Sequence, residues 1–210
     1  MCGPGVPTMS QYGEDTRSIL ADLIESRRSL REYSGAPVSR AALEWIVACG
    51  QGPSGAGQRN APSAHALYPL RLFAIINRLD DSSCPPGLYA FDGAHRRLGP
   101  RLGTTSPQAL RATSLADDHW LEHAAVVLVV AADYPAARGH FADQQPDGLR
   151  GERYVHIETG AVLQNLHLAT QAQGLGGVIV AGFDDRRLAG TLALPDGLRS
   201  VALFCIGAPP

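Results

Sequence analysis

The sequence predicts an α+β fold in which one sheet is layered with helices. Strand-like and helix-like segments mix without the regular strand–helix–strand alternation of a doubly wound fold. Residues 124–132 form an unbroken apolar run rich in valine, which is typical of a strand buried on both faces and central in its sheet. A length of 210 residues fits a single hydrophobic core.

The N-terminal half begins with residues 1–13, which are rich in Gly, Pro and Ser, so we expect a flexible leader before one domain over 14–210. From Thr16, apolar residues recur at helical spacing, and Ser39 is the expected N-cap of a second helix. The Gly-rich, polar residues 50–62 predict a loop. Two strands and a turn with a return strand are then predicted over 71–79, 88–92 and 93–101.

The C-terminal half contains the strongest helix signal, over residues 154–173. Apolar residues occur on nearly every face, and the small residues Gly160 and Ala161 permit close helix contact, so this helix is expected to be buried, including between subunits. Gly174 is the expected left-handed C-cap. The polar residues 138–151 predict a mobile loop or lid. The other segments predict a weak helix over 106–123, a helix over 184–194, and strands over 178–183 and 200–207.

Charge and composition exclude several classes of protein. The 20 acidic and 18 basic residues leave a formal net charge of −2, which provides no basic surface for nucleic acids or membranes. Every basic residue is Arg, so any anion must be bound by guanidinium groups or backbone amides. The four cysteines form no CxxC pair, no apolar run is long enough to span a bilayer, and the N-terminus lacks the order of a signal peptide. We therefore expect a cytoplasmic protein with reduced thiols.

Two short motifs offer alternative chemistries. The string GQGPSG, residues 50–55, matches the dinucleotide pattern GxGxxG, but it follows a predicted helix and enters a loop, whereas that pattern needs a strand before it. HWLEH places His119, Glu122 and His123 at a spacing that, on a helix, holds zinc beside a carboxylate base. A zinc hydrolase is therefore a rival hypothesis, although the strand beginning at Ala124 leaves little room for such a helix.

The segment RRSLREY, residues 27–33, is a candidate anion site at the end of the first predicted helix. Arg27, Arg28, Ser29 and Arg31 place three guanidinium groups and one hydroxyl close together in the chain. Such groups bind phosphate through charge-assisted hydrogen bonds. Taken alone, the same segment is equally consistent with a solvated basic turn.

Five ordered blocks resemble those of the nitroreductase superfamily, and within it they look most like the streptolysin-biosynthesis branch, the SagB-type or azoline-oxidase-like dehydrogenases. The blocks run from about residue 19 to residue 207, and their order is more specific than any single string. The resemblance implies a nitroreductase-like fold with a mostly antiparallel central sheet, and a homodimer with two FMN sites, each built from both chains. The blocks are RRSLREY, PSAHALYPLRLFAI, PPGLYAFD, RYVHIETGAVLQNLHLATQAQGLGG and VIVAGFDD.

The resemblance assigns the N-terminal arginine segment to FMN. Arg27, Arg28 and Ser29 resemble contacts to the phosphate and ribityl chain. Arg31 resembles the basic residue at the pyrimidine edge of the flavin, where a positive charge stabilises the reduced ring. Many relatives continue past the last strand with basic residues that complete the phosphate clamp, whereas this sequence stops at Pro210. Phosphate binding is therefore expected to depend more heavily on the N-terminal arginines.

Two further segments match the family pattern around the flavin ring. Pro62, Ser63 and Ala64 resemble the segment that reaches the ring from the partner subunit. Ala181 and Gly182 resemble the strand end whose amide approaches flavin N5, and Gly at this point permits close approach of the backbone.

The reaction implied by the resemblance is ping-pong redox catalysis, in which NAD(P)H reduces FMN by hydride transfer and a small acceptor then takes the electrons. Nitroaromatics, quinones, enones and natural-product intermediates are all compatible acceptors. Alternatives are a flavin-dependent dehydrogenase of a peptide or natural-product intermediate, and an FMN-binding protein without turnover. Two departures bear on the choice: His65 stands where close relatives commonly have Gly, and a chain without Lys lacks the Lys-Tyr pair of azoline-oxidising relatives.

Overall fold

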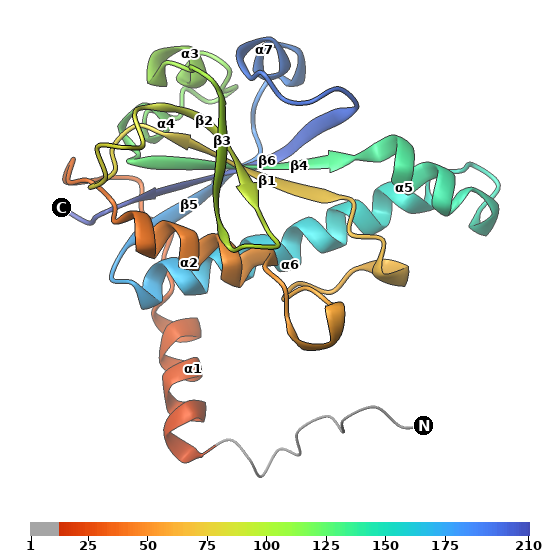
Figure 1. Ribbon diagram of the computed structural model, residues 1–210, viewed down its shortest axis with the longest axis horizontal. Coiled ribbons are helices and arrows are strands. Elements are labelled where there is room, and N and C mark those ends of the chain that lie inside the picture. Colours follow the sequence, from red (N-terminus) through yellow and green to blue (C-terminus); the bar gives the residue numbers. More distant parts are fainter. Residues whose placement is uncertain (1–12) are drawn as a thin grey trace.

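A six-stranded antiparallel sheet forms the centre of the computed structural model, which describes residues 13–210 (Figure 1). The strand order is β3-β2-β1-β4-β6-β5, and each of the five neighbouring pairs is antiparallel. The predicted α+β class is confirmed. Apart from Gly13, the predicted leader lies outside the described residues. The strands are β1 (Leu70–Ile76), β2 (Gly87–Asp92), β3 (Arg97–Gly103), β4 (Val126–Asp133), β5 (Gly176–Val180) and β6 (Leu198–Gly207).

Helices cover both faces of this sheet. In Figure 1, α2 and α6 lie on one face, α3, α4 and α7 lie on the other, and α1 projects away from the body. None of these helices is long and apolar enough to cross a membrane within residues 13–210. The helices are α1 (Glu14–Ser26), α2 (Arg40–Gln51), α3 (Pro107–Arg111), α4 (Trp120–His123), α5 (Tyr134–His140), α6 (Arg150–Ala172) and α7 (Asp185–Thr191), with 3-10 turns at Gly55–Gly57, Ala64–Ala66 and Ala142–Gln144.

Strand β4 is buried on both faces, as the apolar run predicts. It lies between β1 and β6, and Val126 to Ala132 are all fully buried. Its side chains alternate between two cores: Val126, Leu128 and Val130 face the α2 and α6 side, and Val127 and Val129 face the other side. This alternation divides one apolar run between two layers.

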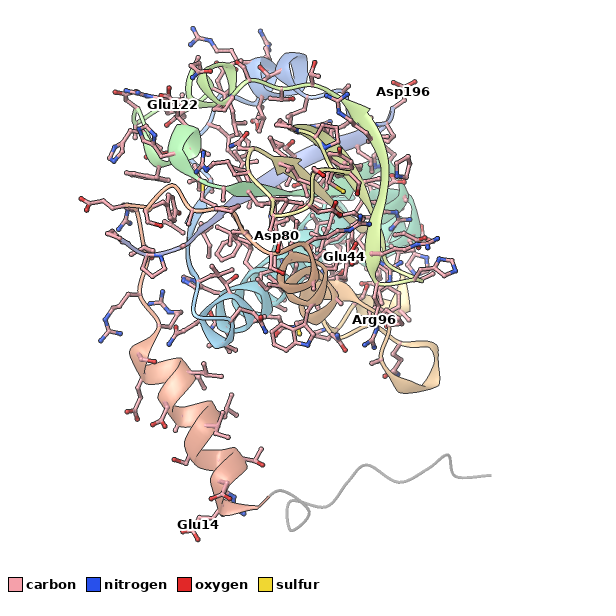
Figure 2. All side chains as sticks on the ribbon, turned by 60° about the vertical axis from the view of Figure 1, so that its left-hand side comes forward. Glu14, Glu44, Asp80, Arg96, Glu122 and Asp196 are labelled. Atoms are coloured by element: carbon pink, nitrogen blue, oxygen red, sulfur yellow. The ribbon has the colours of Figure 1, made fainter. Side chains whose placement is uncertain are left out.

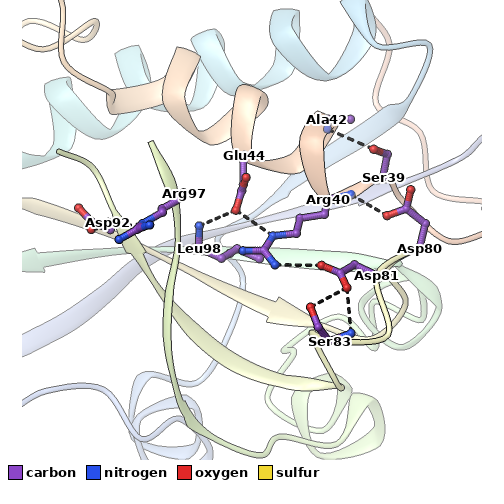
Figure 3. A network of polar contacts seen from close by, with 10 residues as sticks. All are labelled: Ser39, Arg40, Ala42, Glu44, Asp80, Asp81, Ser83, Asp92, Arg97 and Leu98. Atoms are coloured by element: carbon purple, nitrogen blue, oxygen red, sulfur yellow. Dashed lines mark hydrogen bonds and ion pairs between the residues drawn. The ribbon is translucent and has the colours of Figure 1, made fainter. Parts of the chain in front are cut away.

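Polar contacts fix the N-terminal part of helix α2. The Ser39 hydroxyl accepts a hydrogen bond from the Ala42 N–H, which confirms Ser39 as the N-cap. Arg40 pairs with Glu44 at 3.0 Å and with Asp81 at 2.9 Å, and Glu44 also accepts from the Leu98 N–H (Figure 3). This network joins α2 to β3 and to the segment between β1 and β2.

Two predicted segments are wrong in outline. Residues 138–151 are not one loop: they include the end of α5, a 3-10 turn and the start of α6. The Asp133 side chain caps α5 by accepting from the Ala136 N–H, a local signal that the sequence reading overlooked. The weak helix predicted over 106–123 is two short helices, because residues 112–119 between α3 and α4 turn instead.

Candidate functional site

Residues 27–33 extend the sheet beyond its edge strand β5. Ser29 forms a parallel bridge with Gly177, and the Leu30 N–H donates to the Gly177 carbonyl at 3.0 Å. A Cβ atom at Gly176 would lie 2.1 Å from the Leu30 side chain, so a larger residue there would displace this segment. The arginine segment is therefore a fixed part of the sheet edge, and not a free turn.

The His167 side chain of helix α6 makes a hydrogen bond to the same segment. This side chain is 3% exposed, and its Nε2–H donates to the Arg28 carbonyl at 3.1 Å. Burial lowers the pKa of His167, and the nearby charge of Arg27 lowers it further. The imidazole is accordingly neutral and serves as a hydrogen-bond donor. The role of His167 could not be predicted from the sequence, because it is one of several isolated histidines.

The guanidinium groups of this segment are not neutralised by any carboxylate of the described residues. Within residues 13–210, Arg27, Arg28 and Arg31 have no carboxylate at ion-pairing distance. Arg28 does donate to the Glu25 and Arg27 carbonyls at 2.8 Å, which caps the end of α1. Arg31 lies over the Trp120 ring at 5.3 Å, and the buried Trp120 Nε1–H has no acceptor in the described part of the chain. An electron-rich or anionic group beside Arg31 would suit this surplus of donors.

Residues Ala181 and Gly182 follow β5 on the same edge of the sheet. The Gly182 carbonyl accepts from the Leu115 N–H at 2.8 Å, whereas its own N–H has no hydrogen-bond partner among residues 13–210. Gly182 is exposed, and a Cβ atom there would meet nothing within 4 Å. The space beside this amide is therefore open to a ligand.

The segment of Pro62, Ser63 and Ala64 is anchored elsewhere, by Glu158 of α6. One carboxylate oxygen of Glu158 accepts from the Ser63 hydroxyl and from the Ala64 N–H, both at 2.9 Å, and the Ser63 oxygen in turn accepts from the Tyr68 N–H. Glu158 is 5% exposed, and burial raises its pKa, while these hydrogen bonds act in the opposite direction. Sequence reasoning missed Glu158, because a single acidic residue within a helix gives no sign that it is buried.

Within one chain, α6 keeps the two groups of site residues apart. Glu158 and His167 are nine residues apart on this helix, which corresponds to roughly 14 Å along its axis. The structure places residues 27–31 beside the start of β5, where Ser29 bridges Gly177, and residues 181–182 just after its end, whereas residues 62–64 are held by α6.

His65 adopts a backbone conformation that favours glycine. Its φ is +52°, and the nearby Ala66 and Tyr68 have φ of +53° and +51°. His65 Nδ1 lies 3.1 Å from His140 Nε2, and its ring lies 5.1 Å from that of the buried Phe141. The backbone shape expected of Gly is thus kept with an imidazole at this position, beside Ser63 and Ala64.

The HWLEH motif does not form a zinc site. Helix α4 has only four residues, and the Glu122 carboxylate accepts from Arg111 at 2.9 Å and from Gln108 at 3.0 Å. These two contacts lower the pKa of Glu122 and occupy the group that would serve as base. In the described part of the chain, no group of three or more His, Cys, Asp or Glu side chains is placed to hold a metal ion.

Comparisons with known proteins point to one family. The model of the nitroreductase family matches residues 24–208. A Methanocaldococcus jannaschii protein named as a nitroreductase is 31% identical over 170 residues, which cover 80% of this chain and 81% of that protein. A Thermus thermophilus protein named NADH dehydrogenase is 27% identical over 205 residues, which cover 87% of this chain and 83% of that protein.

Solved structures share the fold at low identity. A nitroreductase structure from Anabaena variabilis has a TM-score of 0.78 at 20% identity and covers 94% of this chain, which spans only 39% of that longer chain. The E. coli microcin synthetase McbBCD, solved with truncated pro-MccB17 bound, has a TM-score of 0.71 at 19% identity over 100% of this chain and 77% of that one. A Desulfovibrio desulfuricans nitroreductase structure in complex with FMN has a TM-score of 0.60 at 24% identity, over 91% and 86%.

The buried contact of Glu158 generates a stability prediction. Glu158→Ala leaves the Ala64 N–H and the Ser63 hydroxyl without their acceptor, so it should lower the free energy of unfolding by about 2 to 3 kcal/mol. Glu158→Gln keeps an acceptor oxygen and adds no buried charge, so at neutral pH it should be at least as stable as wild type. Urea unfolding of the three proteins measures both effects.

Glu158 should also make the free energy of unfolding depend on pH. Because the pKa of Glu158 is raised in the folded chain, its contribution to stability should fall as pH rises from the ordinary glutamate value of 4.5 through the raised value. Glu158→Gln should lack this decline. Equal pH dependence in the two proteins would contradict the raised pKa.

Proposed function

The chain belongs to the nitroreductase family, and from this premise we propose that it is an FMN-dependent oxidoreductase. The observation that carries the proposal is a set of donors along β5 and α4: Arg27 and Arg31 without a carboxylate partner, and the Trp120 and Gly182 N–H groups without an acceptor, all within residues 13–210. The FMN in the Desulfovibrio desulfuricans structure, which has the same fold, supports this choice of cofactor.

Bound FMN would supply the hydride chemistry, since no side chain at the site is a redox group. Arg27, Arg28 and Ser29 would hold the phosphate and ribityl chain. Arg31, supported by Trp120, would place positive charge where the reduced flavin gains negative charge. The Gly182 N–H would donate a hydrogen bond from the strand end.

We propose that NAD(P)H is the electron donor and that a small molecule is the acceptor, in a ping-pong cycle. The name of the Thermus thermophilus relative, NADH dehydrogenase, supports a nicotinamide donor. Nitroaromatics, quinones, enones and natural-product intermediates are the proposed acceptors. A second candidate, a SagB-type dehydrogenase of a peptide or natural-product intermediate, is favoured by the similarity to the microcin synthetase, although this chain has no Lys for a Lys-Tyr pair.

We also propose that the working form is a homodimer. On α6, the Ile157 side chain is 63% exposed, and Ala161 and Leu168 are partly exposed. On α1, which projects away from the body (Figure 1), Ile19 and Ile24 are also exposed. A second chain would cover both surfaces, and its residues 62–64 would complete the flavin site.

An absorbance spectrum tests the central proposal. The purified protein should take up FMN and show flavin absorbance, and NADH or NADPH should bleach it under anaerobic conditions. A protein that binds no FMN would overturn the proposal. Bound FMN that neither NADH nor NADPH reduces would indicate an FMN-binding protein without this turnover.

Two arginines of one segment should behave differently. Arg27→Ala should weaken FMN binding about ten- to a hundredfold, because a phosphate contact acts equally in both oxidation states. Arg31→Ala should lower the midpoint potential of the bound flavin and slow its reduction even at saturating FMN. FMN titrations and redox titrations of both variants distinguish these effects.

The exposed Arg186 of α7 provides the control, since Arg186→Ala should change neither FMN affinity nor midpoint potential. If Arg31→Ala loses only affinity and keeps the wild-type potential, the role given to Arg31 is wrong.

Dimerisation and FMN binding should be lost together. Ile157→Asp replaces the exposed apolar side chain of α6 with a charge, so light scattering should show a monomer and an FMN titration should show greatly weakened binding. Ala189→Asp adds the same charge to exposed α7 on the opposite side of the sheet, and it should change neither property. A monomeric Ile157→Asp variant with wild-type FMN affinity would refute the two-chain site.

A further inference from the structure

A pocket of about 440 Å³ lies away from the β5 edge, between the loop after α2, the start of β1 and the tip of the β2–β3 hairpin. Figure 2 shows Arg96, at the hairpin tip, beside this loop, and its side chain donates to the Pro53 carbonyl. The apolar part of the lining includes Leu70, Leu72 and Phe91. The volume is within the range of small-molecule sites, and is larger than a single phosphate needs.

Arg59 enters this pocket in a fixed orientation. Its guanidinium lies over the Tyr68 ring at 4.9 Å, and its backbone N–H donates to the Tyr68 hydroxyl at 3.1 Å. The side chain is half-buried. Stacking on an aromatic face leaves the N–H groups at the edge of a guanidinium free to bind an oxyanion.

Arg71 brings a second positive charge to the same pocket. Its guanidinium is held by the Tyr68 and Leu70 carbonyls, at 2.8 and 3.0 Å. Burial lowers the pKa of Arg59, and the charge of Arg71 lowers it further, so the two groups repel each other. Neutral carbonyl oxygens relieve this repulsion only in part.

No carboxylate of the described chain balances the two arginines. Neither Arg59 nor Arg71 has an acidic side chain at ion-pairing distance within residues 13–210. The acidic side chain in the lining, Asp92, lies 2.7 Å from His95. It also lies 4.0 Å from Arg97, which Figure 3 shows beside it. The pocket is thus lined by two guanidinium groups that bind only carbonyl oxygens or an aromatic ring, and by an apolar wall.

We propose that this pocket is a second ligand site, which binds the phosphate or carboxylate group of a small organic anion between Arg59 and Arg71. The oxyanion would receive charge-assisted hydrogen bonds from both guanidinium groups, and the apolar part of the ligand would lie against Leu70, Leu72 and Phe91. Its arginines are different residues from Arg27 and Arg28, which the proposed function assigns to the flavin phosphate, so variants can test the two sites separately.

The pocket also has a direct connection to the segment of Ser63 and Ala64. Tyr68, under the Arg59 guanidinium, donates its backbone N–H to the Ser63 hydroxyl at 2.8 Å, and that hydroxyl is bound to Glu158. Arg59 and Arg71 flank this segment in the chain on its two sides. An anion held here would therefore be close to the residues that the flavin proposal assigns to the partner's site.

Calorimetric titration of the FMN-saturated protein tests the site, with pyrophosphate, adenosine 2′,5′-bisphosphate and malonate as probes. At least one probe should bind saturably, and Arg59→Gln and Arg71→Gln should each weaken its binding about tenfold or more. Arg186→Gln, at an exposed position on α7, should have no effect. Binding of the phosphates alone indicates a phosphorylated ligand, and binding of malonate indicates a carboxylated one; either result supports the oxyanion site.

Thermal unfolding of each variant, with and without the probe, distinguishes lost anion binding from misfolding. Each variant should unfold close to the wild-type temperature without anion, because relief of the repulsion offsets the lost contacts of the arginine, and it should lose the upward shift that the probe gives wild type. FMN affinity should be unchanged in both variants, which separates this site from the flavin proposal. The inference is overturned if no probe binds saturably, or if both variants bind the probes like wild type.

Discussion

The fold depends most on the placement of α6 under the sheet, with two buried polar side chains at fixed separation. His167 satisfies a carbonyl of the arginine segment, and Glu158 satisfies the Ser63 hydroxyl and the Ala64 N–H. Buried polar groups without partners are costly, so each contact fixes both the helix and the segment it holds. The spacing of the two side chains along α6 therefore determines how far apart the two groups of site residues lie.

This spacing supports the proposal that the flavin site uses residues from two chains. A rigid helix cannot shorten to bring residues 62–64 to the edge where Arg31 and Gly182 lie. The apolar residues left open on α6 and α1 lie on surfaces that a second copy could bury. The separation of the site residues and the exposed apolar side chains are independent observations, and both favour the proposed homodimer.

Much of the fold was predictable from the sequence, because its signals are local. The valine-rich run of β4 and the Ser39 cap identify their elements without tertiary information. The segment 138–151 was predicted wrongly, because polar composition outweighed the Asp133 cap and the close packing of Gly151, where a Cβ atom would lie 2.2 Å from the Ala137 carbonyl oxygen. Glu158 and His167 could not be found from the sequence, since their importance comes from burial and from partners distant in the chain.

The lack of lysine concentrates the positive charge of this protein in guanidinium groups, whose surroundings separate structural from ligand-binding roles. Arg40 and Arg111 each pair with two carboxylates, and such arginines join elements of the fold. Arg31 and Arg59 instead lie over aromatic rings, with no acid at ion-pairing distance in the described chain. An aromatic face orients a guanidinium without neutralising its charge, so it leaves the hydrogen-bonding edge available. The same arrangement therefore occurs at the β5 edge and at the pocket beside β1, and it supports the proposed binding of an anion at both places.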